Sequence, residues 1–364
     1  MKKYIVIVLA LILSLSMVLA VSADQDATEE KWEDVFEYWN PEAPALNTLI
    51  EYVENVTDES SEDFIPVADR IAIFDMDGTL YGEMFPTYLG LYALAWRILE
   101  DPGYQPDEEM LEFGREIRES VRRGSYADDF TERYINMFAK AFAGMTLAEY
   151  SEFITQLLLQ DVDGFEGMTY GEAFYLPMLE VIEYLQDNDF TVYVCSGSDR
   201  FLCRTLLEGV IDIPYANIIG MDVAVEAAGQ NGEDGLYYVY SAEDDILRTD
   251  KLIIYNVKMN KVLQIVQEIG RQPVLSFGNS SGDMSMHNYT IYNNPYKSMA
   301  FMLIADDEER DYGYEPYTQM LGEQWEAYGY NTISIREDFL TIYGEDVVRT
   351  GVFNWLSILS DDRD

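Results

Sequence analysis

The hydrophobic pattern of the chain changes period after residue 80. Residues 71–74, Ile-Ala-Ile-Phe, form a short apolar run that is typical of a strand buried on both faces of a parallel sheet. From residue 81 to 169 the apolar positions repeat at helical spacing instead. This predicts four helices, at residues 88–99, 108–122, 130–143 and 147–159. Because no comparable strand interrupts them, we expect residues 81–169 to form a helical cap.

Strand-like and helix-like segments alternate again after residue 170, which is the pattern of a doubly wound parallel sheet. The predicted strands span residues 190–195, 218–225, 236–240, 273–277, 299–304 and 332–335. The predicted helices span residues 178–186, 196–207 and 261–269. Asn231-Gly232 is a turn signal, and it predicts a hairpin between the second and third of these strands. The fold class is therefore α/β, with a helical cap inserted after the first strand motif.

The N-terminal segment has the pattern of a signal peptide. Lys2 and Lys3 precede an apolar run at residues 5–21, and small residues end at Ala23 before an acidic stretch. An uncleaved anchor is the alternative, but an apolar stretch of about 17 residues is short for a membrane span. We therefore expect an exported protein, periplasmic or extracellular, with no stable membrane anchor after cleavage.

These patterns divide the chain into five parts. The signal peptide is residues 1–23, and an N-terminal helical lead-in with helices at 32–38 and 46–53 occupies residues 24–69. Residues 70–80 and 170–345 form the catalytic core, and residues 81–169 form the cap. Residues 346–364 are a C-terminal tail.

Charge narrows the range of partners. The 364 residues include 23 Lys and Arg against 67 Asp and Glu, a net charge of −44, which argues against nucleic acid or an anionic membrane as partner. An anionic substrate would need local positive charge from a metal ion, a lysine or a helix N-terminus. The two cysteines, Cys195 and Cys203, are either small buried side chains or, in an oxidising compartment, a disulfide. The oligomeric state stays open.

Two carboxylates follow the first strand directly. Asp75 and Asp77 stand two residues apart at its carboxyl end, where ligands gather in sheets of this type. Asp75 can act as a nucleophile and Asp77 as a general acid, while Gly78 lets the chain bend and the Thr79 hydroxyl can bind an anion. The alternative is an Asx-type turn, which would explain one Asp and the Gly but not the second Asp.

Another polar segment follows the strand at residues 190–195. The Ser196 hydroxyl and the backbone N–H groups of Gly197 and Ser198, at a helix start, would form an anion-binding corner. The alternative is an ordinary strand-to-helix turn in which Ser198 is the N-cap.

The loop after residues 273–277 contains hard oxygen ligands. Asn279 and Asp283 suit Mg²⁺ beside Asp75, although a polar turn or a glycosylation-like sequon is the alternative. Lys261, which heads the helix entering that strand, can supply the buried positive charge, with Lys258 as its competitor. We expect the single histidine, His287, to serve packing.

Taken together, these motifs resemble those of the haloacid dehalogenase-like hydrolase superfamily. Its first motif matches Asp75-Met-Asp-Gly-Thr79, the second matches Ser196, the third Lys261, and the fourth Gly278-Asn-x-x-x-Asp283. The match spans residues 70–310 approximately, and a bacterial exported branch related to phosphoserine phosphatase looks most similar. The resemblance implies a Rossmann-like core and favours Lys261 over Lys258. Asn279 stands where the superfamily often has Asp.

The resemblance implies a Mg²⁺-dependent phosphomonoesterase that acts on a small phosphoester. Asp75 would attack phosphorus to give an aspartyl-phosphate, and Asp77 would protonate the leaving alkoxide and then activate water. The ligands of Mg²⁺ would be Asp75, the Asp77 carbonyl, and Asp283 or Asn279. The phosphate would be bound by Thr79, Ser196, Gly197 and Lys261. The alternatives are a phosphotransferase that uses another acceptor and an inactive acidic module that binds cations.

Two residues after the first motif are candidates for substrate specificity. Tyr81 and Glu83 place an aromatic ring and a carboxylate where the leaving group must lie, which suits a cationic or polar alcohol. Glu83 matches the amine-binding acid of phosphoserine phosphatase only approximately, one position off. The alternative is that the aromatic residues of this segment only pack the cap against the core.

Overall fold

The computed structural model describes residues 35–82, 87–313 and 315–351. The chain divides into a unit of residues 1–37, of which only 35–37 are described, and a unit of residues 38–364, which carries every element below. The predicted signal peptide and Glu83 lie outside the described residues, as does the tail from residue 352 onward. Among the helices of the described part, none is long and apolar enough to cross a membrane.

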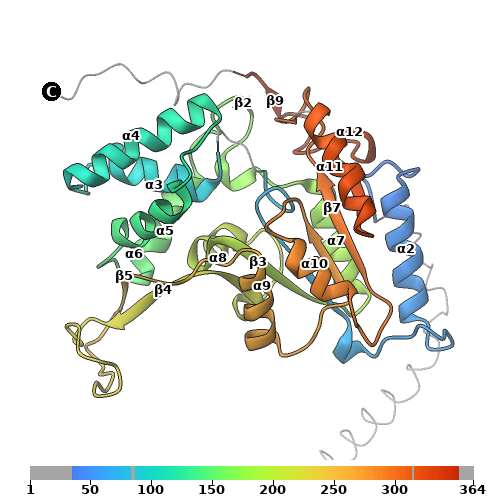
Figure 1. Ribbon diagram of the computed structural model, residues 1–364, viewed down its shortest axis with the longest axis horizontal. Helices are drawn as coiled ribbons and strands as arrows, with labels where there is room; N and C mark the ends of the chain where they lie inside the picture. The colour runs from blue at the N-terminus through green and yellow to red at the C-terminus, as the bar shows by residue number, and fades with distance from the viewer. Residues whose placement is uncertain (1–34, 83–86, 314, 352–364) are drawn as a thin grey trace, which may run out of the picture. The chain divides into compact units, whose positions relative to one another are not determined.

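A seven-stranded sheet with the order β5-β4-β3-β1-β6-β7-β8 forms the centre of the larger unit (Figure 1). Every neighbouring pair is parallel except β4 and β5. The strands are β1 Ile71–Phe74, β3 Thr191–Asp199, β4 Ile218–Ala227, β5 Ile246–Ile254, β6 Leu275–Gly278, β7 Met299–Ile304 and β8 Asn331–Ser334. A separate two-stranded sheet joins β2 Phe165–Glu166 and β9 Val348–Arg349. The predicted α/β class with a mostly parallel sheet is confirmed.

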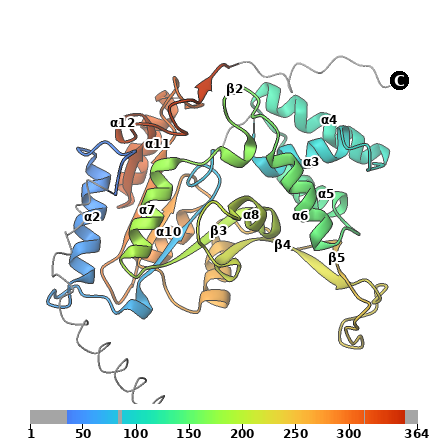
Figure 2. The same ribbon diagram turned by 180° about the vertical axis from the view of Figure 1, so that it is seen from behind.

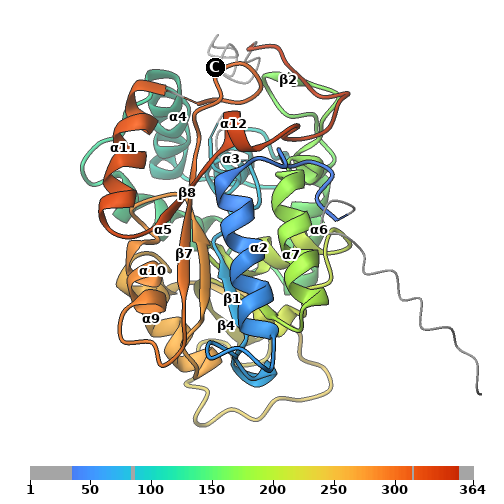
Figure 3. The same cartoon turned by 90° about the vertical axis from the view of Figure 1, so that its right-hand side faces the viewer.

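Helices cover both faces of the sheet. In Figure 3, α2 and α7 lie on one side of the strands, and α9, α10 and α11 lie on the other. The helices outside the inserted segment are α2 Pro44–Thr57, α7 Leu176–Asp187, α8 Arg200–Leu207, α9 Met259–Gln264, α10 Met284–Ile291, α11 Glu315–Ala327 and α12 Ile335–Asp338. A π-helical turn, Ile265–Ile269, continues α9, and short 3₁₀ turns occupy Val67–Asp69, Tyr170–Glu172 and Tyr215–Asn217. The predicted helix at residues 178–186 is confirmed as α7, which begins two residues earlier and ends one residue later.

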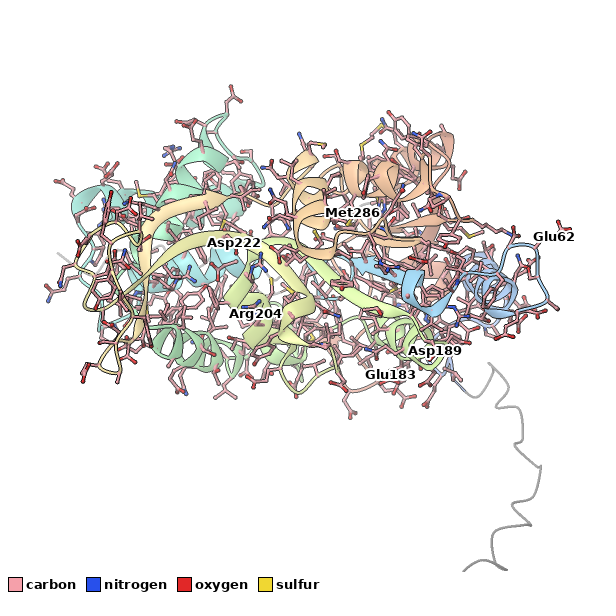
Figure 4. The ribbon with its side chains drawn as sticks, turned by 90° about the horizontal axis from the view of Figure 1, so that it is seen from below. Glu62, Glu183, Asp189, Arg204, Asp222 and Met286 are labelled. Carbon is pink, nitrogen blue, oxygen red and sulfur yellow. The ribbon has the colours of Figure 1, made fainter. Side chains whose placement is uncertain are left out.

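The centre of the core lies where β1 meets its neighbours. All four residues of β1 are buried, as expected for a strand covered on both faces. Ile73 packs with Cys195, Ile219, Ile265 and with Met286 of α10, which is labelled in Figure 4. Cys195 and Cys203 are both free and buried. The alternative of two small buried side chains is therefore confirmed, and the disulfide is not formed.

The inserted segment contains the four predicted helices (Figure 2). They are α3 Leu89–Leu99, α4 Glu108–Arg123, α5 Phe130–Ala141 and α6 Leu147–Leu158, each within two residues of the predicted bounds. At the start of α6, Thr146 and Glu149 form the reciprocal bonds of a capping box. The division of the chain into core and cap stays a prediction.

The predicted strand at residues 236–240 is wrong. Leu236 and Val239 are 79% and 84% exposed, so apolar side chains in this segment have no surface to pack against. The strand that pairs antiparallel with β4 is β5, ten residues further along the chain. β5 also binds the inserted segment, because Gly144 N donates to Arg248 O at 2.8 Å and Arg248 N donates to Met145 O at 2.8 Å.

The predicted helix at residues 196–207 begins four residues late. β3 continues through Asp199, whose side chain caps α8 by accepting hydrogen bonds from the backbone N–H groups of Phe201 and Leu202, both at 3.1 Å. The N–H groups of Gly197 and Ser198 therefore belong to a strand, and the expected helix-start anion corner is not formed there.

The predicted helix at residues 32–38 is also wrong where it is described. Residues 35–38 form a turn and a bend. The backbone around Trp39 pairs with residues 338–340 instead, since Leu340 N donates to Tyr38 O and Asn40 N donates to Asp338 O, each at 2.8 Å. Pairing across more than 290 residues cannot be found from local periodicity.

Candidate active site

Asp75 and Asp77 lie at the carboxyl end of β1, in the middle of the sheet. Each is 7% exposed. Asp75 is fixed from the neighbouring strand because its N–H donates to Phe277 O at 2.8 Å. The chain then turns at Gly78, which has a φ of +75° that favours glycine. The sequence therefore predicts correctly where these two carboxylates stand on the strand.

Lys261 joins two of the predicted site carboxylates. Its Nζ donates to Asp75 Oδ1 and to Asp283 Oδ1, both at 2.6 Å, and the lysine is 1% exposed. Lys258 is exposed and stands at the N-cap of α9 with a φ of +53°. The structure therefore favours Lys261 as the buried cation.

The electrostatics of the site are unbalanced toward negative charge. Burial and the nearby Asp283 raise the pKa of Asp75, while the ion pair with Lys261 opposes this shift. Burial would lower the pKa of Lys261, but Asp283 and Asp75 raise it above its usual range, so the ammonium stays charged. One buried lysine thus faces three buried carboxylates, including Asp77.

The Ser198 side chain belongs to the site, although the sequence pointed only to its backbone N–H and to a role as N-cap. Its Oγ donates to Asp77 Oδ2 at 2.6 Å and partly offsets the burial that raises the pKa of Asp77 to about 6. The predicted Ser196 is fully buried, and its Oγ accepts from Ser198 N at 3.0 Å. Residues 196 and 198 share one face of a strand, so extending the predicted strand by four residues would have pointed to Ser198.

The fourth motif forms a tight turn around Asp283. Asp283 Oδ2 accepts from the N–H groups of Asn279 and Ser280 at 3.2 and 3.0 Å. A Cβ on Gly278 would lie 2.7 Å from Asp283 Cβ, so only glycine allows this approach. Asn279 and Asp283 both line the pocket described below.

The oxygen atoms at this site fit a magnesium ion. Asp77 Oδ1 is buried without a hydrogen-bond partner among the described residues, beside two further carboxylates and an amide. Hard oxygen donors of this kind suit Mg²⁺, which is held by one or two carboxylates while waters or substrate phosphate complete its shell. Among the residues that the structure describes, no cluster of three or more His, Cys, Asp or Glu side chains that could hold a metal ion is found.

A pocket of about 270 Å³ lies above these groups. Its polar part includes Asp75, Asp77, Ser198, Lys261 and Asp283 together with Gly197 and Asn279. Its remaining wall is mainly aromatic, formed by Tyr88, Tyr126, Phe130, Tyr134 and Tyr255. Four of these five rings come from the inserted segment, which therefore contributes one wall of the pocket.

Three predicted residues of the described part, Ser196, Tyr81 and Thr79, do not line the pocket. Tyr81 is 1% exposed, its hydroxyl donates to Tyr170 O at 2.7 Å, and its ring packs edge-on against Phe174 at 5.3 Å. These contacts favour the packing alternative over a role in specificity. Thr79 is fully buried, and its hydroxyl has no partner in the described part of the chain.

His287 packs in the core, in agreement with the prediction. It is fully buried, and its Nδ1 lies 2.7 Å from Ser276 Oγ. Burial lowers its pKa to about 4, so the imidazole is neutral at ordinary pH.

The fold and the site together define a Rossmann-like α/β protein with an Asp-Lys-Asp cluster at the carboxyl end of its central strand. No family model matches the chain, and no curated protein does. Solved structures that resemble it include a functionally unknown protein from Anaerococcus prevotii DSM 20548, at 12% identity and a TM-score of 0.49 over 85% of this chain and 98% of that one.

Two further solved structures have named activities. Cytosolic 5'-nucleotidase IIIB bound to cytidine is 9% identical, with a TM-score of 0.47 over 79% of this chain and 84% of that one. A phosphoserine phosphohydrolase-like protein from Francisella tularensis is 14% identical, with a TM-score of 0.37 over 66% and 89%. Hydrolases named as members of the haloacid dehalogenase-like group are also among the matches.

Proposed function

We propose that this protein is an exported Mg²⁺-dependent phosphatase that hydrolyses a small phosphomonoester. The observation that carries the proposal is the buried cluster in which Lys261 binds both Asp75 and Asp283, with Asp77 two residues beyond Asp75 on the same turn. The resemblance of the four motifs to haloacid dehalogenase-like hydrolases supports it.

Asp75 acts as the nucleophile. Its carboxylate attacks phosphorus, the ester P–O bond breaks, and the phosphoryl group remains on Asp75 as an aspartyl-phosphate. Lys261 holds Asp75 Oδ1 and contributes positive charge as negative charge moves onto the phosphoryl oxygens. Water then attacks the aspartyl-phosphate, which releases phosphate and restores Asp75.

Asp77 moves the protons. It protonates the leaving alcohol oxygen in the first step and takes a proton from the attacking water in the second. A pKa raised to about 6 by burial suits a group that has to serve as both acid and base near neutral pH. The hydrogen bond from Ser198 holds Asp77 Oδ2, which fixes the direction of the carboxyl group.

Magnesium fits this site as the balancing charge. The ligands of the magnesium ion would be Asp75, the main-chain carbonyl of Asp77, and Asp283 or Asn279. When bound, the magnesium ion neutralises the negative charge of the phosphoryl oxygens. Gly197 lines the same pocket, and a Cβ there would lie 3.0 Å from Val257 Cγ1, so a larger residue would crowd this part of the pocket.

A phosphate-release assay tests the proposal. The protein is expected to hydrolyse 4-nitrophenyl phosphate in Mg²⁺ and to lose this activity in EDTA, with recovery when Mg²⁺ is restored. Asp75→Asn is nearly isosteric and should abolish turnover while the circular dichroism spectrum stays that of the wild type. Full activity in EDTA would contradict the metal assignment, and residual turnover in Asp75→Asn would contradict the nucleophile.

The export part of the proposal rests on the N-terminal pattern of residues 1–23. N-terminal sequencing of protein recovered from a producing bacterial host is expected to begin at Asp24. A chain that retains Met1 in the membrane fraction would contradict cleavage.

A further inference from the structure

The wall opposite the catalytic groups is built from aromatic rings. Tyr126 and Phe130 have ring centroids 4.6 Å apart, and Tyr134 follows one turn later on α5. Tyr255, directly after β5, and Tyr88, directly before α3, complete the set. We refer to these five residues as the aromatic wall. A leaving group held above Asp75 and Asp77 must lie against it.

The charge of the pocket disfavours an anionic leaving group. Lys261 is the only cationic side chain among the described residues that line the pocket, and Asp75, Asp77 and Asp283 line it as well. Bound Mg²⁺ and the phosphate of a substrate would roughly cancel one another, so the carboxylates remain in excess. The net charge of −44 adds to the same field. A positively charged alcohol portion is therefore favoured over a neutral one, and a neutral one over an acid.

The size of the pocket favours a compact alcohol. Its volume of about 270 Å³ lies just below the range of about 300–1,000 Å³ that holds drug-sized ligands. The phosphate occupies part of this space, so the remainder suits a short chain with a small head better than a nucleoside.

We infer that the substrate class is the phosphate ester of a small alcohol with a quaternary ammonium group, which the aromatic wall binds through cation–π contacts. This inference rests on the proposed function. Aromatic faces attract a quaternary ammonium by about 0.5–2 kcal/mol and give no such attraction to a neutral group of the same shape. The residues that carry this preference are those of the aromatic wall, and Tyr81 is not one of them.

A pair of isosteric substrates tests the inference. Phosphocholine and 3,3-dimethylbutyl phosphate differ only in a nitrogen against a carbon at the centre of the head group. For the wild type, kcat/KM is expected to be about tenfold or more higher for phosphocholine than for 3,3-dimethylbutyl phosphate. Hydrolysis of 4-nitrophenyl phosphate reports the chemical step separately. Equal kcat/KM values for the two isosteres, or a preference for a nucleoside monophosphate over phosphocholine, would overturn the inference.

Variants of one residue assign the preference to the wall. Tyr126→Leu keeps bulk but removes the aromatic face, so it should lower the ratio of the two kcat/KM values several-fold. Tyr126→Phe keeps the face and should keep the ratio. Tyr237→Leu is the matched control, because Tyr237 is 72% exposed and does not line the pocket. A ratio that survives Tyr126→Leu and Tyr255→Leu would contradict the role of the wall.

The same assay separates the two proposals. If no ester is hydrolysed, the proposed phosphatase function fails and the inference fails with it. If 4-nitrophenyl phosphate and 3,3-dimethylbutyl phosphate are hydrolysed and phosphocholine has no advantage, the function stands and only the inference fails. Thermal melting of each variant by circular dichroism shows that the ratio is measured on folded protein.

Discussion

Replacing Arg248 with methionine is expected to destabilise the protein strongly. The Arg248 guanidinium donates from Nη2 to Asp199 Oδ2 at 2.8 Å and from Nη1 to Asp199 Oδ1 at 3.2 Å. The two side chains are 0% and 1% exposed. The guanidinium also lies 3.9 Å from the centroid of the Tyr150 ring on α6. Methionine would fill most of the space but leave the Asp199 carboxylate buried without its cation.

The size of the loss in unfolding free energy depends on the contacts that Asp199 keeps in the variant. Removal of one member of a buried ion pair costs about 3–5 kcal/mol. Asp199 would still accept the two backbone hydrogen bonds of the first turn of α8, which places the loss toward the lower end of that range. Asp199→Asn can keep the helix cap and should cost less. In the double variant no buried charge is unpaired, so it should be less destabilised than the sum of the single variants by about 2 kcal/mol.

Urea unfolding of the four proteins in this mutant cycle measures these values. Arg123→Met is the matched control, because Arg123 pairs with Glu119 at 3.5 Å while their side chains are 55% and 36% exposed, and such pairs contribute less than about 1 kcal/mol. A loss below about 1 kcal/mol for Arg248→Met, or additive effects in the double variant, would refute the reasoning.

Two further predictions concern the site and the pH dependence of stability. Ser198→Ala removes the hydrogen bond that orients Asp77, so it should slow hydrolysis of an alkyl phosphate about tenfold or more. Hydrolysis of 4-nitrophenyl phosphate should barely change, because its leaving group needs no proton. Equal losses for both esters would exclude this role of Ser198. Burial raises the pKa of Asp311 to about 6, so between pH 4 and 6 the folded chain holds a proton that the unfolded chain has released, and stability falls as pH rises. Asp311→Asn should therefore match the wild type in urea unfolding at pH 3.5 and exceed it by up to about 3 kcal/mol at pH 8; a constant difference between the two pH values would contradict the assignment.

Much of the fold could be predicted from local patterns along the chain. The strand at residues 71–74 and the four helices of the inserted segment were predictable because period and capping are local properties. The strand β5 was not, because its sequence, Ile-Leu-Arg-Thr-Asp-Lys-Leu-Ile-Ile, places charged residues where an isolated strand would show regular alternation. Arg248 in that strand is buried only because Asp199 lies across from it, and no local pattern reports such a partner.

The candidate site was predictable to the same extent. Asp75, Asp77, Lys261 and Asp283 carry motif signals, and the structure brings them together. The aromatic wall carries no such signal, since only Phe130 and Tyr134 lie on one helix, α5, and the other three rings lie in segments beside α3, α5 and β5. Its membership depends on which face of α5 meets the sheet, and that is decided by tertiary packing.

The hydrogen bonds between β5 and the loop at residues 144–145 limit how a substrate can enter. A rigid rotation of α3 to α6 away from the sheet would break both bonds and would also separate Tyr150 from Arg248. Tyr88 and Tyr126 line the pocket and are 40% and 44% exposed, so their rings can rotate without breaking either bond. Exposed side chains change rotamer in picoseconds to nanoseconds, whereas domains open in microseconds to milliseconds. An entry route that turns only these two side chains would therefore keep the contacts between β5 and the inserted segment, whereas a rigid opening would break them.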